Sequence, residues 1–107
     1  MEKGNAPEYS CELAQLYLAA GDARKAIETL RRAKEENPDR LDVLLALGNA
    51  YSADKQYAAA IREFREVLEG APDLEMAREQ LAKALRAAGR GQEAAQVYLE
   101  PRVAKQH

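Results

Sequence analysis

Cys11 and His107 are the two side chains that could serve as a nucleophile or a metal ligand, since the sequence holds one cysteine and one histidine. A cysteine nucleophile needs a nearby base or positive charge to lower its pKa, and no basic residue lies within a helical turn of Cys11. His107 is the last residue, where no scaffold holds it. A single cysteine also excludes an intrachain disulfide and a thiolate metal cluster. We therefore expect no catalytic residue and no metal site, and Cys11 is interpreted as a small packing residue.

The segment Gly89-Arg90-Gly91 is the other pattern with chemical potential, because closely spaced glycines can cradle a phosphate. A phosphate-binding loop of the G-x-x-x-x-G-K kind follows a strand, and the sequence contains neither that motif nor a strand pattern. The two glycines are interpreted as a turn. The sequence thus predicts no enzyme activity, no cofactor and no small-molecule substrate.

The elements that would have to position any site follow an internal repeat, since Pro38-Asp39 returns as Pro72-Asp73. The interval from Pro38 to Pro72 is called the repeat step below. Five further columns keep this step: Leu13, Leu47 and Leu81; Ala14, Gly48 and Ala82; Tyr17, Tyr51 and Leu85; Ala26, Ala60 and Ala94; and Leu30, Phe64 and Tyr98. A period of this length is typical of a supersecondary unit that buries its apolar face by stacking on copies of itself.

Helical periodicity and turn residues predict helices over 8–20, 23–36, 40–53, 57–69 and 74–88, and a shorter one from about residue 92 to 99 or 100. Asp22 is expected to cap the second helix, and Pro101, which lacks an amide hydrogen, to end the last one. Turns of two to four residues force antiparallel neighbours, so the fold class is an all-α solenoid. The small columns permit close helix packing, and Leu30, Phe64 and Tyr98 are expected to fill the spaces between helices.

Composition narrows the function classes. Apolar residues make up 47% of the chain and charged residues 32%, which fits a helical globular domain. A net charge of −2 argues against nucleic-acid binding, which relies on neutralising phosphates, and against a membrane surface. Residues 1–7 have no signal-peptide core, and no stretch approaches the roughly 20 apolar residues of a membrane span. We expect a soluble, cytoplasmic protein.

These columns resemble the tetratricopeptide repeat, whose unit of about 34 residues carries W-x2-L-G-x2-Y followed by Ala, Phe or Tyr, and Pro. The resemblance covers about nine tenths of the chain and is clearest in Leu44, Leu47, Gly48, Tyr51, Ala60, Phe64 and Pro72. Ser10 and Arg78 depart from it where an aromatic residue is usual, and Pro101 stands where a small residue belongs. The resemblance implies a right-handed solenoid in one domain over 7–101, with helix-turn-helix units 7–40, 41–74 and 75–101. A disordered or capping segment 1–6 would precede it, and a frayed tail 102–107 would follow.

The resemblance also implies a protein or peptide partner, held as an extended or helical segment in a concave groove built mainly from the first helix of each unit. The family's groove positions correspond here to Glu8, Cys11, Glu12, Gln15, Leu18, Asp42, Leu45, Asn49, Ser52, Met76, Glu79, Lys83 and Arg86. Leu45 and Met76 would supply apolar contacts, Asn49 a hydrogen-bonding amide, and Lys83 with Arg86 positive charge.

A co-chaperone subfamily holds a chaperone's C-terminal carboxylate with lysine, asparagine and arginine at five of these positions. Here those positions hold Cys11, Gln15, Asn49, Glu79 and Lys83. A carboxylate needs several converging donors to offset its desolvation, so we expect no carboxylate clamp.

Two alternatives remain open. Ala94, Val97 and Tyr98 form a face that a further helix covers in longer arrays, and a repeat protein needs a polar cap there. We expect a second copy, giving a homodimer or another homo-oligomer, or a further part of a longer protein to cover this face. The other alternative is an RNA-binding helical repeat, against which the low charge argues.

Overall fold

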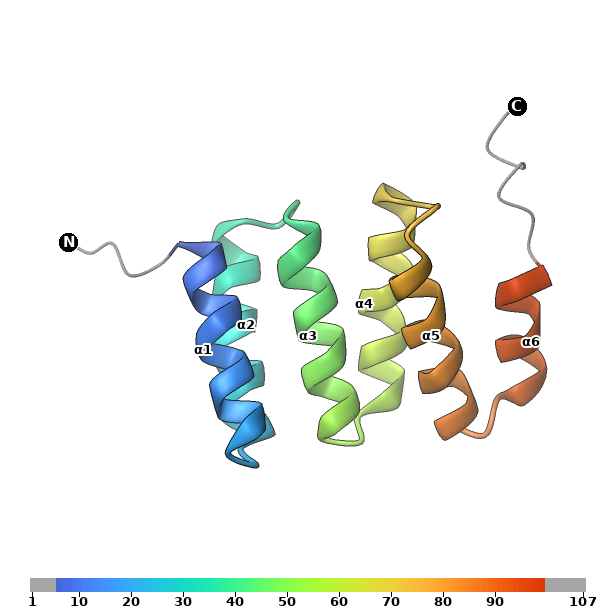
Figure 1. Cartoon of the computed structure of the whole chain (residues 1–107), viewed down its shortest axis with the longest axis horizontal. Coiled ribbons are helices and arrows are strands. Elements are labelled where there is room, and N and C mark those ends of the chain that lie inside the picture. The colour runs from blue at the N-terminus through green and yellow to red at the C-terminus, as the bar shows by residue number, and fades with distance from the viewer. Residues whose placement is uncertain (1–5, 100–107) are drawn as a thin grey trace.

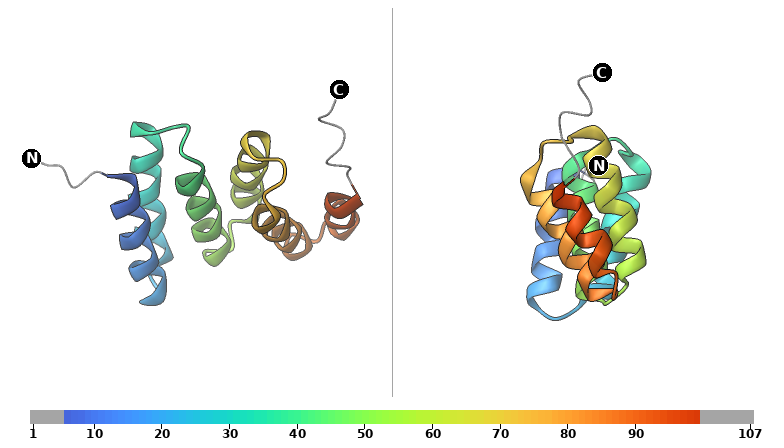
Figure 2. Two further views of the ribbon diagram at one scale, coloured as in Figure 1. Left: turned by 45° about the horizontal axis from the view of Figure 1, so that its top comes forward. Right: turned by 90° about the vertical axis from the view of Figure 1, so that its right-hand side faces the viewer.

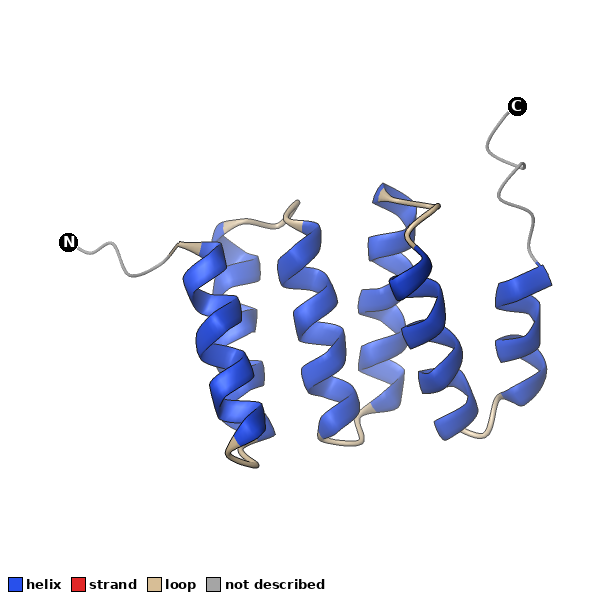
Figure 3. Cartoon of the chain, viewed as in Figure 1, coloured by secondary structure: helices blue, strands red, loops and turns tan. Residues whose placement is uncertain are grey.

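The structure is a computed structural model that describes residues 6–99, and these residues form six helices joined by short turns (Figure 1). The helices are α1 (Pro7–Ala19), α2 (Ala23–Glu36), α3 (Leu41–Ala53), α4 (Tyr57–Gly70), α5 (Glu75–Ala87) and α6 (Gly91–Leu99). Over the described range there is no strand, and Figure 3 shows helices and turns alone. The expected helices are confirmed to within one residue at these ends. The expectations for the tail 102–107 and for residues 1–5 lie outside the described residues.

The helices stack in chain order, so that each packs against the next, while α3 also contacts both α1 and α5. Figure 2 shows the row from two further directions, and the principal extents of 45 × 31 × 17 Å describe an elongated stack. This arrangement confirms the helical solenoid. The first helices of the three pairs, α1, α3 and α5, are therefore neighbours across the repeat.

The turns inside the three helix pairs share one backbone conformation. Gly21, Lys55 and Gly89 stand one repeat step apart and have φ angles of 82°, 62° and 81°. In the first of these turns the Asp22 amide donates to the Tyr17 carbonyl at 2.8 Å, and Asp22 then accepts from the Lys25 amide at 3.2 Å. A residue in the left-handed region with a hydrogen bond back into the helix is a common C-terminal cap. The predicted Asp22 cap is confirmed.

Small residues let the paired helices approach closely, as the repeat columns predict. Ala26 and Ala60 are fully buried, and Ala14, Ala82 and Ala94 are at most 1% exposed. Gly48 is buried as well. The small side chains at these positions leave room for larger neighbours. Leu30 and Phe64 fill that room and have no exposed surface.

Tyr98 is the exception in its column, because 51% of it is exposed. The expectation that Tyr98 fills a space between helices is wrong. Its counterparts Leu30 and Phe64 are covered by the helix that follows their own, whereas no described helix follows α6. Burial at this column depends on the next helix in the stack.

Ion pairs add to the apolar contacts between neighbouring pairs of helices. Lys34 on α2 lies 3.1 Å from Glu63 on α4, whose side chain is only 9% exposed, and 3.7 Å from Glu66. Arg65 on α4 reaches Glu93 on α6 at 3.3 Å. The Lys34–Glu63 contact therefore links α2 to α4, and removing one partner would leave the other charge uncompensated.

Candidate protein-interaction surface

The thirteen predicted groove positions all lie on the first helices of the three pairs, and together we call them the A-helix surface. Its members are Glu8, Cys11, Glu12, Gln15 and Leu18 on α1, Asp42, Leu45, Asn49 and Ser52 on α3, and Met76, Glu79, Lys83 and Arg86 on α5. Each of them is exposed or half-buried. Because α3 contacts both α1 and α5, the three helices that carry these positions are neighbours (Figure 1). Whether a ligand uses this surface stays a prediction.

The apolar members of the A-helix surface differ in how freely they can contact a ligand. Leu18 and Cys11 pack against the buried cluster shared by α1, α2 and α3. Leu45 packs against two clusters, one of them centred on Phe64. Met76 is 54% exposed. Met76 therefore offers the largest free apolar area of the four, while the others present only one side.

The polar centre of the surface is Asn49, in the middle of α3. Its side chain is half-buried and makes no hydrogen bond within residues 6–99. Lys83 and Arg86 are exposed on α5, one helix away. An amide provides two N–H donors and a carbonyl acceptor, so Asn49 can bond a peptide main chain in either direction.

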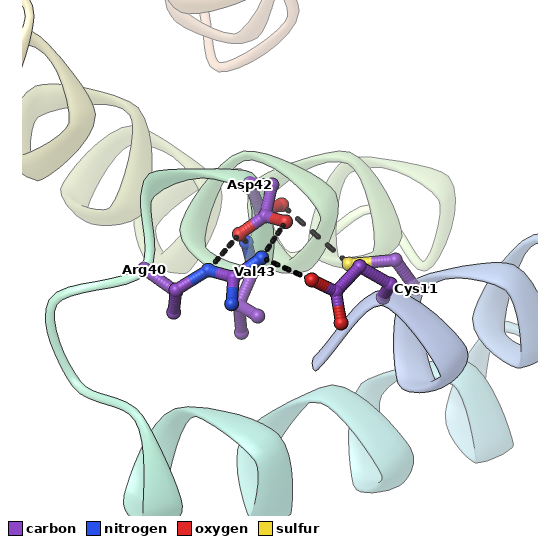
Figure 4. A network of polar contacts seen from close by, with 5 residues as sticks. Cys11, Arg40, Asp42 and Val43 are labelled. Carbon is purple, nitrogen blue, oxygen red and sulfur yellow. Dashed lines mark hydrogen bonds and ion pairs between the residues drawn. The ribbon is translucent and has the colours of Figure 1, made fainter. Parts of the chain in front are cut away.

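The α1 end of the surface holds a network that the sequence does not reveal (Figure 4). Arg40, just before α3, donates to Asp42 at 2.8 and 3.1 Å and to Glu8 on α1 at 3.2 Å. The hydrogen bond from Arg40 holds the pKa of Asp42 below its ordinary value. The pKa of Glu8 is also lowered, first by a hydrogen bond to the backbone and then by Arg40. Arg40 thus neutralises part of the acidic end.

Cys11 lies beside this network, with its sulfur 3.8 Å from the main-chain oxygen of Asp42. Burial raises the pKa of the Cys11 thiol, and the charge of Asp42 raises it further. A raised pKa keeps the thiol protonated and poorly nucleophilic. The interpretation of Cys11 as a packing residue agrees with this environment.

Three surface cavities lie away from the A-helix surface. One of about 340 Å³ opens between α1 and α2, with Tyr9 and Leu13 in its lining. Another of about 340 Å³ lies between α4 and α6, beside Leu68 and Val97. The third, of about 390 Å³, lies between α2 and the turn after α3. None of these three is lined by a predicted groove residue.

The expected open face of Ala94, Val97 and Tyr98 is only partly open. Ala94 is 1% exposed and Val97 is 7% exposed, because both pack into the cluster that also holds Phe64 and Leu81. The placement of these two residues on an uncovered face is therefore wrong. Tyr98 does point outward, beside the exposed Leu99.

The stack of antiparallel helix pairs with an accessible face on the first helices defines the class, an α-helical repeat protein. Tetratricopeptide repeat models match residues 17–73 and 46–105. The chain belongs to the tetratricopeptide repeat family. Family membership supports a role in protein interaction. No helix within residues 6–99 has the length and apolar character that crossing a membrane requires.

Solved structures of MamA share the fold. One of them superposes with a TM-score of 0.82 at 20% identity, over 97% of this chain and 56% of the other. MamA of MSR-1 gives 0.76 at 28% identity, over 87% of this chain and 53% of the other. MamA of AMB-1 gives 0.73 at 27% identity, over 87% and 55%. The chain thus spans little more than half the length of these structures. A search of curated proteins found no match.

Proposed function

We propose that the chain is a non-catalytic scaffold that binds an extended or helical segment of a partner protein on the A-helix surface. One observation carries the proposal. The half-buried amide of Asn49 lies on the central first helix, α3, and has no hydrogen-bond partner within residues 6–99. A partly desolvated amide with unused donors and acceptor strengthens a hydrogen bond to an incoming main chain.

The side chains around Asn49 supply the other parts of a peptide site. Met76 offers exposed apolar area on α5, and Leu45 is half-buried on the neighbouring helix α3. Lys83 and Arg86 outnumber Glu79 among the α5 members, so that end of the surface is net positive, whereas Arg40 compensates part of the acidic charge at the α1 end. The preferred segment therefore carries an apolar residue followed by acidic residues over α5.

A displayed library of random peptides tests this proposal. Peptides selected on the unmodified chain are expected to lose about tenfold or more in affinity for an Asn49→Ala/Lys83→Ala variant. The matched control is Arg62→Ala/Gln92→Ala, which also removes one amide and one positive charge but from the exposed faces of α4 and α6. Equal binding to both variants would show that the A-helix surface is not the site.

The RNA-binding alternative is separated by a salt titration with polyuridylate as the probe. Phosphate contacts make RNA affinity fall steeply with salt, whereas a mixed apolar and amide surface responds weakly. We expect no RNA binding at physiological salt. Tight, steeply salt-dependent binding would favour the RNA-binding alternative instead.

A further inference from the structure

The two interfaces between successive helix pairs use the same four positions. At the first, Ile27 and Leu30 of α2 share a buried cluster with Leu47 and Ala50 of α3. At the second, one repeat step later, Ile61 and Phe64 of α4 share a buried cluster with Leu81 and Ala84 of α5. All eight side chains are at most 6% exposed. The chain thus builds one apolar interface twice.

The outer face of α1 repeats the receiving half of this interface, with no partner for it among residues 6–99. Tyr9, Leu13 and Leu16 stand one repeat step before Val43, Leu47 and Ala50, which are at most 1% exposed. In α1, however, Tyr9 is 58% exposed, Leu16 is 68% exposed and Leu13 is half-buried. Exposing three apolar side chains on one helix face to water costs free energy. A patch of this kind is typical of an interaction site.

The outer face of α6 repeats the inserting half. Ala95 and Tyr98 stand one repeat step after Ile61 and Phe64, and both are exposed, Tyr98 to 51%. Leu99 extends the same face and is 77% exposed. The two ends of the stack therefore carry the two halves of an interface that the chain completes internally.

Side-chain size points to one occupant for both faces. Each internal interface combines an isoleucine on the inserting helix with an alanine on the receiving helix, as in Ile27 with Ala50. At the ends the sizes are exchanged, because α6 carries Ala95 and α1 carries Leu16. The combined volume of the inserting and the receiving side chain is preserved only when α6 of one copy meets α1 of another. Volume-conserving exchanges of this kind are well tolerated in packed interfaces.

A cavity of about 340 Å³ marks the place where the inserting helix fits. Tyr9, Leu13 and Tyr17 line it from α1, and Thr29, Arg32 and Ala33 line it from α2. The corresponding place in the second helix pair is occupied by α2, whose Lys34 reaches Glu63 at 3.1 Å. Glu63 is the counterpart of Thr29, one repeat step further along the chain. The cavity between α1 and α2 thus corresponds to the place between α3 and α4 that α2 occupies.

We propose that the chain associates head to tail, with α6 of one copy seated on the α1–α2 face of a second copy. Tyr98 then packs on Leu13 and Leu16, as Leu30 packs with Leu47 and Ala50 inside the chain. The two contacting faces differ, so the association is heterologous and extends into a filament or closes into a ring. It does not use the A-helix surface, which stays free along the assembly.

Complementary variants test the proposal. Leu16→Glu blocks the receiving face and Tyr98→Glu blocks the inserting face, and both sites are exposed enough that the fold tolerates the change. We expect the mass of the unmodified chain in sedimentation velocity to rise with concentration. Each variant alone is expected to stay monomeric, with self-association weakened about tenfold or more. An equimolar mixture is expected to form a 1:1 dimer, because each variant keeps the half that the other lacks.

Every outcome of the mixing experiment decides the question. A dimer that either substitution leaves intact, or two monomeric variants that fail to combine, would overturn the head-to-tail contact. So would an unmodified chain that stays monomeric into the millimolar range. Circular dichroism melts check that the variants fold, and Gln15→Glu places the same charge on α1 away from this face as the control. The groove variant Asn49→Ala/Lys83→Ala is expected to associate normally, so failure here and failure of peptide binding remain distinct.

Discussion

The ring of Phe64 occupies the space that a side chain at Gly48 would need. A Cβ built on Gly48 would stand 2.5 Å from Cε1 of Phe64 and 2.8 Å from Cδ1, closer than carbon atoms can approach. The ring cannot turn aside easily, because Phe64 is completely buried. The first helix pair solves the same contact differently, with Ala14 and Leu30 at the equivalent positions. Glycine and phenylalanine at the second pair are therefore one coupled choice.

This coupling predicts the effect of Gly48→Ala. Alanine gains about 1 kcal/mol of helix propensity over glycine, but overpacking against Phe64 costs about 1–3 kcal/mol, so we expect a net loss of up to roughly 2 kcal/mol. Gly48→Ala/Phe64→Leu reproduces the Ala14 and Leu30 pair and is expected to recover part of the loss. Urea unfolding of the single and double variants measures the coupling. Purely additive losses would contradict it.

Lys55 carries the second prediction, because it is the non-glycine member of the three equivalent turns, with φ at 62°. The left-handed region costs a non-glycine residue about 1–2 kcal/mol, and the greater flexibility of glycine in the unfolded chain offsets part of what glycine would recover. We expect Lys55→Gly to stabilise the chain by roughly 0.5–1 kcal/mol in thermal or urea unfolding. Lys55→Ala removes the same side chain without relieving the backbone and should show no such gain.

The repeat register predicts features that depend on neighbours inside the stack. Gly21-Asp22 and Asn37-Pro38 predict the bounds of α2, and the small columns predict which helices approach closely. Tyr98 departs from its column because its burial depends on a following helix, which periodicity cannot supply. The sequence predicts the turn at Lys55 but not its left-handed backbone, since the glycine that signals it in Gly21 and Gly89 is absent.

The contacts of the candidate site residues are harder to predict from the sequence than the helices are. The A-helix positions follow from register, but the contacts of Arg40 with Glu8 span two helices and leave no local pattern. The α1–α2 cavity can be anticipated by going back one repeat step from Val43 and Leu47 to Tyr9 and Leu13. In the repeat register the first helix therefore also presents an apolar face, in addition to the one that Tyr98 marks on the last helix.

Arg78 leads to the third prediction, since it is 7% exposed in a column where the family usually has an aromatic residue. Its guanidinium donates to the Val97 carbonyl on α6 and, at 3.4 Å, to the Pro72 carbonyl. Four residues after Val97 the sequence has Pro101, which offers no amide hydrogen to that carbonyl. Arg78 therefore supplies a donor to a carbonyl in the last turn of α6.

We expect Arg78→Met to keep the apolar volume but to lose about 1–3 kcal/mol, the range for hydrogen bonds from charged groups and for an unsatisfied carbonyl. Relative to the unmodified chain, amide hydrogen exchange in Arg78→Met should accelerate more in α6 than in α3. Arg78→Met/Pro101→Ala restores an amide hydrogen at the position that would pair with Val97, and a smaller loss is expected. Uniform destabilisation without faster exchange in α6 would argue against this role.

The Arg40 network gives the pH prediction. The pKa values of Asp42 and Glu8 are lowered in the folded chain, so the folded state holds these carboxylates charged more readily than the unfolded state does. Their contribution to stability is present above the unfolded values near pH 4 and is lost as the pH falls through the lower folded values. Arg40→Met should destabilise the chain slightly at pH 7, because both carboxylates are well exposed and such pairs are weak.

The difference in urea unfolding between Arg40→Met and the unmodified chain should shrink as the pH drops below about 4 and as salt is added. Arg62→Met removes an exposed cation of α4 for which no carboxylate contact is seen within residues 6–99 and serves as the control. A difference that stays constant with pH would mean that Arg40 acts through packing of its side chain and not through Asp42 and Glu8.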